Sequence, residues 1–192
     1  MRSIARSTFC LVAVIALTAC VGSRSKAPDL QLLTARPAAA TAPLAATIGV
    51  GPVRIAQFLH RPQIVTHGGG VVLRVNDAQR WGEPLEQGIQ RVLMQNIGVL
   101  TGAETRNFPW RQNLTPDYAV RLEVVDLDRL DDGTALLDVS WVLEDLKNAR
   151  VLKTQQEKLQ TRVGAGDSAL AEAYSDLLAQ LAQRISSQLG TP

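Results

Sequence analysis

Residues 118–163, YAVRLEVVDLDRLDDGTALLDVSWVLEDLKNARVLKTQQEKLQTRV, contain the clearest structural pattern in the chain. Apolar side chains alternate with other residues in residues 118–127 and again in residues 135–143, where Trp141 lies on the apolar face. A period of two predicts half-buried strands, because successive side chains of a strand point to opposite faces. Asp131-Asp132-Gly133 supplies a turn between the two runs. We therefore expect an antiparallel meander of three strands, the third formed by residues 151–163.

Helical patterns lie on both sides of this meander. Residues 84–100 repeat apolar side chains at helical spacing, and Pro84 suits the first turn of a helix. Residues 170–189 show the same spacing after a break at Gly164-Ala165-Gly166-Asp167. Both segments are therefore expected to be amphipathic helices that cover the sheet.

Shorter apolar runs before the meander predict further strands. Residues 48–55 form one, interrupted by Gly51-Pro52, which should bend it or introduce a bulge. Residues 63–67 and 71–75 flank three glycines and should pair as a hairpin, with a connection over residues 77–81. A brief strand is expected near residues 105–108. The fold class is α/β, one domain over residues 47–192 with a mixed sheet of about six strands and two main helices.

The N-terminus has the features of a bacterial secretory signal over residues 1–19. Arg2 and Arg6 form a basic start, and an apolar run from residue 9 to 19 follows. Eleven residues are too few to span a hydrocarbon core of about 30 Å. The run ends in Leu17-Thr18-Ala19-Cys20, which resembles the lipobox of bacterial lipoproteins. We expect cleavage before Cys20, with diacylglycerol and an N-acyl chain on Cys20 and no other cofactor.

The residues after the predicted cleavage site indicate in which membrane the protein is anchored and how far its domain can lie from that membrane. Val21 is not the aspartate that retains lipoproteins in the inner membrane, so we expect the periplasmic face of the outer membrane. Residues 20–46 are rich in Ala, Pro, Ser and Thr and are expected to form a lipidated, flexible linker with a reach of roughly 25 to 30 Å.

Charge and cysteine content exclude several classes of function. Arg2 and Arg6 leave with the signal, so the mature chain carries 18 basic and 18 acidic residues. A neutral chain without a basic cluster lacks the electrostatic features of nucleic-acid binding. The two cysteines are Cys10, which leaves with the signal, and Cys20, which is blocked by lipid; disulfides and cysteine catalysis are therefore excluded.

Candidate catalytic and metal-binding groups are sparse. His60 and His67 have no cysteine or acidic pair at the spacing of a zinc site, and we expect them to be structural or exposed. Asp126, Asp128 and the aspartates of the following turn lack the spacing of a calcium loop and should lie at a solvated strand end. The sequence thus favours a protein that binds over one that catalyses. An envelope hydrolase or a cell-wall-binding lipoprotein remains the alternative.

The third strand of the meander, residues 151–163, is polar on both faces. Charged side chains protect the exposed edge of a sheet from pairing with other chains, which is one interpretation of this pattern. The other is a surface for a partner, and Gln156 and Lys158 are the candidate contacts on it.

Two motifs resemble those of the PqiC (YmbA) family of ABC-type transport auxiliary lipoproteins. The first is Phe58-Leu59-His60-Arg61-Pro62-Gln63-Ile64-Val65, and the second is Gln79-Arg80-Trp81-Gly82-Glu83-Pro84-Leu85 at the start of the first helix. His60 stands where aspartate is usual. The resemblance implies a fold like the TolB N-terminal and anticodon-binding domains.

The same resemblance implies a role in moving lipids between the two membranes. Its partner would be an MCE-domain protein of the PqiB type, and the lipid anchor would hold it to the membrane; formation of a homo-oligomer stays open. The candidate contacts for the partner are Arg61, Pro62, Gln63, Arg80, Trp81 and Glu83. Alternatively, these residues lock the hairpin to the start of the helix, because residues at element ends often satisfy backbone groups.

Overall fold

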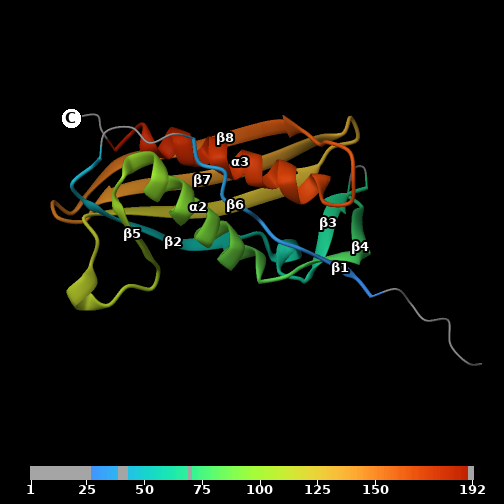
Figure 1. The fold of residues 1–192 in the computed structure, drawn as a ribbon, viewed down its shortest axis with the longest axis horizontal. Helices are drawn as coiled ribbons and strands as arrows, with labels where there is room; N and C mark the ends of the chain where they lie inside the picture. The colour runs from blue at the N-terminus through green and yellow to red at the C-terminus, as the bar shows by residue number, and fades with distance from the viewer. Residues whose placement is uncertain (1–26, 39–42, 69–70, 190–192) are drawn as a thin grey trace, which may run out of the picture.

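The structure is a computed structural model that describes residues 27–38, 43–68 and 71–189. The expected signal peptide and the lipid attachment at Cys20 lie outside these residues. The described chain forms two β-sheets and two long helices, arranged as a helical layer over a large sheet with a smaller sheet at one end (Figure 1).

The larger sheet is mixed. In spatial order it contains β5 (Glu104–Asn107), β2 (Thr47–Ile55), β6 (Tyr118–Arg129), β7 (Thr134–Asp145) and β8 (Arg150–Arg162). β2 runs parallel to both of its neighbours, whereas β6, β7 and β8 form the antiparallel meander that the alternating sequence predicts. β8 lies at the edge of the sheet.

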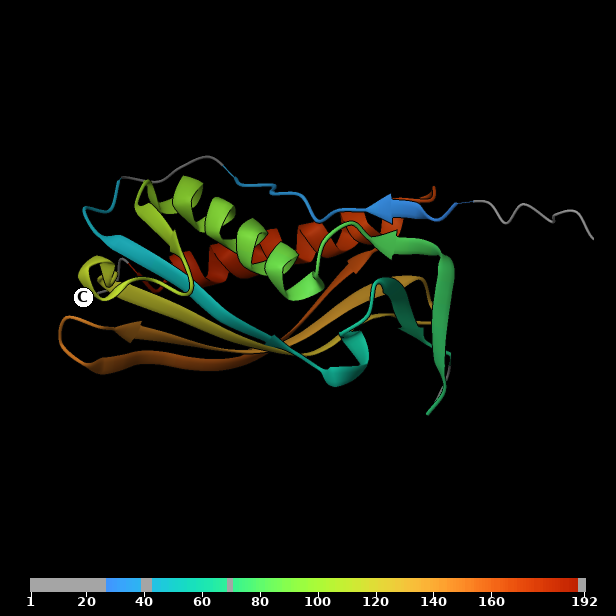
Figure 2. The ribbon, with the colours of Figure 1, turned by 90° about the horizontal axis from the view of Figure 1, so that it is seen from below.

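Both helices cover the same face of this sheet. They are α2 (Leu85–Thr101) and α3 (Ala169–Ser186), and Figure 2 shows the opposite face of the sheet without a covering layer. Their apolar stripes, including Ile89, Leu93 and Leu181, are fully buried against the strands. Two short 3-10 turns, η2 (Gln57–Leu59) and η3 (Gln112–Leu114), lie in the connections.

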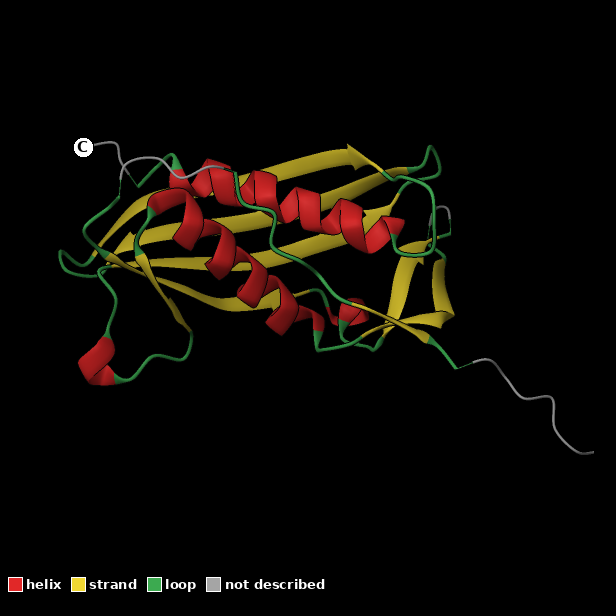
Figure 3. Ribbon diagram, viewed as in Figure 1, coloured by secondary structure: helices red, strands yellow, loops and turns green. Residues whose placement is uncertain are grey.

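The smaller sheet has the order β1 (Asp29–Gln31), β4 (Leu73–Trp81) and β3 (Gln63–His67), at the end of the molecule seen in Figure 3. The hairpin of β3 and β4 is confirmed. The expected connection over residues 77–81 is wrong, because β4 continues to Trp81 and pairs in parallel with β1.

The α/β class with two main helices is confirmed, but the described strands number eight in two sheets rather than about six in one.

The expected interruption of β2 is also confirmed. The register of β2 against β6 shifts between Val50 and Val53, around Gly51-Pro52. Gly51 has a φ of +111°, a conformation that is costly for a residue with a Cβ. A glycine is therefore required where β2 bends.

The expectation of a flexible linker over residues 20–46 is wrong for residues 29–36, which are packed across α2 and α3. Leu33 is 2% exposed. The backbone N–H of Thr34 donates to Ser175 Oγ at 3.0 Å, and that of Arg36 donates to Asn96 Oδ1 at 2.9 Å. Asn96 and Ser175 are buried polar side chains of the two helices, so they satisfy backbone donors that would otherwise be lost.

The position of Trp141 yields a stability prediction. Trp141 is 2% exposed on the helix-facing side of β7, and its indole N–H donates to Glu157 Oε1 at 3.0 Å. Trp141→Ala should lower the free energy of unfolding by about 3–5 kcal/mol, because it removes a large core side chain and leaves a cavity. Chemical denaturation measures this loss.

Val151→Ala on β8 is the control. Val151 is 59% exposed, so this substitution should change the free energy of unfolding by less than about 0.5 kcal/mol. An equal effect of both substitutions would contradict this account of the core.

Candidate functional site

The two motifs meet around one pocket of about 410 Å³ at the junction of the two sheets. One side comes from η2 and the turn before β3, and the other from the end of β4 and the start of α2. The lining residues are Leu59, His60, Arg61, Pro62, Trp81, Gly82, Glu83, Pro84, Leu85 and Glu86. Most of the lining surface is apolar, and every lining residue except Glu86 belongs to a motif.

Backbone hydrogen bonds hold the two sides of the pocket together. The N–H of Trp81 donates to the carbonyl oxygen of Pro62 at 2.6 Å, and the N–H of Gly82 donates to Gln31 O at 2.8 Å. Gln63 and Arg80 are opposite each other in the β3–β4 ladder. The motifs therefore form a single unit, although 13 residues, 66–78, lie between them in sequence.

Two of the predicted contact residues have structural roles. Trp81 is 8% exposed, and its ring packs against Tyr174 of α3 with centroids 6.3 Å apart. Glu83 forms a short ion pair with Arg91, whose guanidinium also donates to Leu33 O at 2.9 Å. For Trp81 and Glu83 the geometry matches the alternative interpretation, in which the motifs lock the hairpin to the helix.

The rim of the pocket is different. His60, Arg61, Pro62 and Pro84 are exposed. The guanidinium of Arg61 forms no hydrogen bond or ion pair with any residue that the structure describes, so it is available to a ligand. Buried apolar side chains, Leu59 and Leu85, lie beneath this rim.

Gln63 and Arg80, two further residues predicted to contact the partner, lie near the pocket but are not part of its exposed rim. Gln63 is half-buried, and its amide donates to Asp77 Oδ1 at 3.3 Å. Arg80 is also half-buried, and its buried Nε has no hydrogen-bond partner among the described residues. Neither residue is among those that line the pocket.

Gln156 and Lys158 lie on β8 and do not line this pocket. Both bind the same carboxylate: Lys158 Nζ lies 3.1 Å from Asp138 Oδ2, and Gln156 Nε2 donates to Asp138 Oδ1 at 3.3 Å. Asp138 is 6% exposed, so this pairing offsets the cost of a buried charge. A change to glutamate at either position would thus disturb the sheet as well as the surface.

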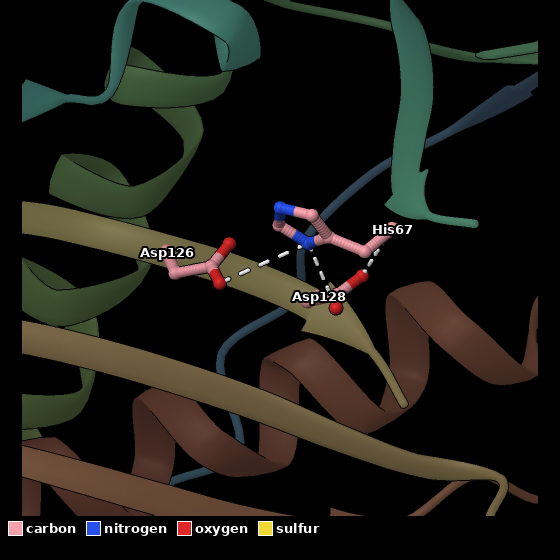
Figure 4. Close-up of side chains that lie close together, drawn as sticks. All are labelled: His67, Asp126 and Asp128. Carbon is pink, nitrogen blue, oxygen red and sulfur yellow. Dashed lines mark hydrogen bonds and ion pairs between the residues drawn. The ribbon is translucent and has the colours of Figure 1, made fainter. Parts of the chain in front are cut away.

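A second cluster joins the hairpin to the larger sheet (Figure 4). His67 at the end of β3 faces Asp126 and Asp128 of β6, and the atoms that could hold a metal ion lie within 4.8 Å of one another. His67 Nδ1 is 2.9 Å from Asp128 Oδ2 and 3.9 Å from Asp126 Oδ2, and the backbone N–H of His67 donates to Asp128 Oδ1 at 2.7 Å. The expected solvated strand end is wrong for Asp128, which is 3% exposed.

The sequence does not reveal this cluster because β3 and β6 are about sixty residues apart. The available signal is the pair of aspartates at positions 126 and 128, two residues apart on a strand and so on one face. Burial raises the pKa of Asp126 above its usual 3.8; His67 opposes this rise, and the negative charge of Asp128 adds to it. The site therefore holds more negative charge than its surroundings favour.

Comparison with solved structures shows that this is a recurrent bacterial α/β fold. A structure described as an uncharacterized protein has a TM-score of 0.71 at 15% identity, over 86% of this chain and 100% of that chain. A Xanthomonas campestris protein assigned to the DUF330 family has a TM-score of 0.62 at 17% identity, over 84% and 91%. A hypothetical protein of Chlamydia trachomatis gives 0.51 at 9%, over 75% and 97%. At these identities the likeness shows the fold alone.

Sequence comparison identifies the family. The family model described as the ABC-type transport auxiliary lipoprotein component matches residues 30–186, and the chain belongs to this family. This result confirms the resemblance that the two motifs indicated. No curated protein matches the chain in sequence. Neither α2 nor α3, nor any shorter helix of the described residues, is long and apolar enough to cross a membrane.

The raised pKa of Asp126 gives a pH-dependent prediction. A carboxyl group whose pKa is higher in the folded than in the unfolded protein lowers stability as pH rises from about 4 through the folded pKa. Asp126→Asn removes this loss, so it should raise the melting temperature at pH 7, and the gain should vanish as pH falls below about 4. Thermal melts across pH 3–8 test this. A lower melting temperature for Asp126→Asn at pH 7 would contradict it.

Proposed function

We propose that this chain is a non-enzymatic subunit of an ABC-type system that moves lipids between two membranes, and that its motif pocket binds the MCE-domain partner. The observation that carries the proposal is that nine motif residues, from segments about twenty positions apart, line one exposed pocket. Membership of the auxiliary lipoprotein family supports an association with a transport complex.

The chemistry of the pocket indicates the kind of segment it would bind. Leu59, Leu85 and Trp81 offer apolar surface, and the free guanidinium of Arg61 stands at the rim. Binding sites of this type combine apolar burial with a few polar groups that fix orientation. An extended partner segment with an aliphatic side chain next to a carboxylate meets both requirements, because arginine pairs well with carboxylates.

The other residues predicted to contact the partner would support the pocket or lie outside it. Trp81 and Glu83 hold the pocket in shape, and Gln63 and Arg80 join its two sides through the β3–β4 ladder. Gln156 and Lys158 would belong to a separate contact area at the edge of the larger sheet.

The N-terminal segment bears on how the domain would sit at the membrane. We propose that the chain is anchored through acylated Cys20 to the periplasmic face of the outer membrane. Asp29, where β1 begins, lies nine positions after Cys20, and a chain of this length spans at most about 30 Å. Because residues 29–36 are packed against the helices, the end of the molecule that carries β1 and the pocket would lie near the membrane surface.

Charge reversal at the pocket rim should weaken partner capture. Arg61→Glu is expected to reduce the MCE-domain protein recovered by co-purification from detergent extracts by about tenfold, equivalent to 1.4 kcal/mol. The fold should stay intact, because the Arg61 side chain is exposed and without described partners. Circular dichroism checks the fold.

Arg111→Glu is the matched control for this experiment. Arg111 is exposed next to η3, is not among the residues that line the pocket, and undergoes the same change of charge. Recovery of the partner should match that of the unaltered protein. Equal recovery with both variants, each of them folded, would contradict the assignment of the pocket.

Anchoring has its own test. Cys20→Ser should yield an uncleaved precursor or a chain without acyl groups, because no other residue after the signal offers a thiol. Mass spectrometry of the mature N-terminus from the native envelope measures this. A mature chain that begins elsewhere than Cys20, or that carries no lipid, would refute the anchor without affecting the pocket.

A further inference from the structure

We propose that His67, Asp126 and Asp128 form a binding site for a divalent transition-metal ion of the zinc type. The site lies between the hairpin and the larger sheet, and it is separate from the motif pocket, because none of its three residues lines that pocket.

The spacing of the donor atoms suits a metal ion. Zinc binds nitrogen and carboxylate oxygen at about 2.0–2.2 Å, so two ligands of a tetrahedral ion lie about 3.3 Å apart. His67 Nδ1 lies 2.9 Å from one aspartate oxygen and 3.9 Å from the other, which bracket this value. Small side-chain movements would therefore bring all three atoms to bonding distance.

The charge at the site also favours a cation. Within the described chain, the imidazole of His67 is the one basic side chain that pairs with Asp126 or Asp128. By contrast, Asp138, which lies opposite Asp126 in the sheet, is bound by Lys158. Asp126 Oδ1 is buried and has no hydrogen-bond partner among the described residues. The other oxygen of the same carboxylate, Asp126 Oδ2, is the one that faces His67. A carboxylate that is partly buried and lacks a donor on one oxygen is costly, and a cation bound to Oδ2 would offset its negative charge.

The ligand atoms, and the residues that orient them, indicate which metal ions fit the site. One imidazole and two carboxylates suit zinc and its first-row neighbours, whereas calcium and magnesium prefer oxygen donors alone. The ring of His67 packs edge-on against Phe58 with centroids 5.7 Å apart, and the N–H of His67 holds the other oxygen of Asp128. Such outer contacts orient metal ligands. The side chains of His67 and Asp126 are 33% and 25% exposed, which leaves a route for the ion.

Binding would add a further link between the hairpin and the larger sheet. An ion at this site would cross-link β3 with β6, and so fix the hairpin on the larger sheet. The proton on Nδ1 would leave to solvent, because a ligating imidazole nitrogen must be free of its proton.

The test uses zinc chloride and the full mature protein in detergent micelles at pH 7. His60 and His67 are the two histidines of the chain, so imidazole NMR signals report on the site and on an internal control together. Zinc should shift the signals of His67 and leave those of His60 unchanged. Calorimetry should give one equivalent of zinc per chain.

Asp126→Asn is the decisive variant. It keeps the size of the side chain and leaves Asp128 and its two contacts with His67 in place, so the fold should persist, as circular dichroism will show. Its zinc affinity should fall at least tenfold. His60→Gln is the matched control and should bind zinc as the unaltered protein does. Unchanged zinc affinity in Asp126→Asn, a zinc response at His60 alone, or no response up to 1 mM zinc would each overturn the proposal.

Discussion

The structure depends on the burial of Trp81, where the two sheets and the helical layer meet. Its backbone closes the hairpin by donating to Pro62 and pairs with Gln31 of β1, while its ring packs against Tyr174 of α3. An aromatic side chain at such a junction gains a large buried area and fixes the angle between the elements that it joins. This junction holds the two motifs beside each other, so the contacts that stabilise the fold also form the pocket.

The N-terminal segment is also fixed to the helical layer by buried contacts. Asn96 and Ser175 are fully buried polar side chains in the two helices, and each accepts a hydrogen bond from the backbone of residues 34–36. Buried polar groups are retained when their partners are present, so the helices carry a built-in site for this segment. A lipid-anchored domain attached in this way would be held close to the membrane at one defined end, rather than free at the end of a long tether.

Local patterns predict most of the fold and little of its long-range pairing. The alternation in the meander and the helical spacing around Ile89 and Leu181 identify elements whose burial faces follow from period alone. The packing of residues 29–36 does not follow from their own sequence, because their partners Asn96 and Ser175 are distant in the chain, although each is a polar residue within an apolar stripe. The cluster of His67 with Asp128 cannot be predicted for the same reason: β3 and β6 belong to different sheets that the fold brings together, and no spacing in the chain indicates their approach.

We propose above that the transport partner docks in the pocket formed by the two motifs. Replacing His60, an exposed residue of the pocket rim, by a photoreactive phenylalanine analogue tests this in intact envelopes. A crosslink to the MCE-domain protein is expected from position 60 and none from position 111, which is also exposed but is not part of the pocket. Crosslinks to that protein from position 111 but not from position 60 would contradict it.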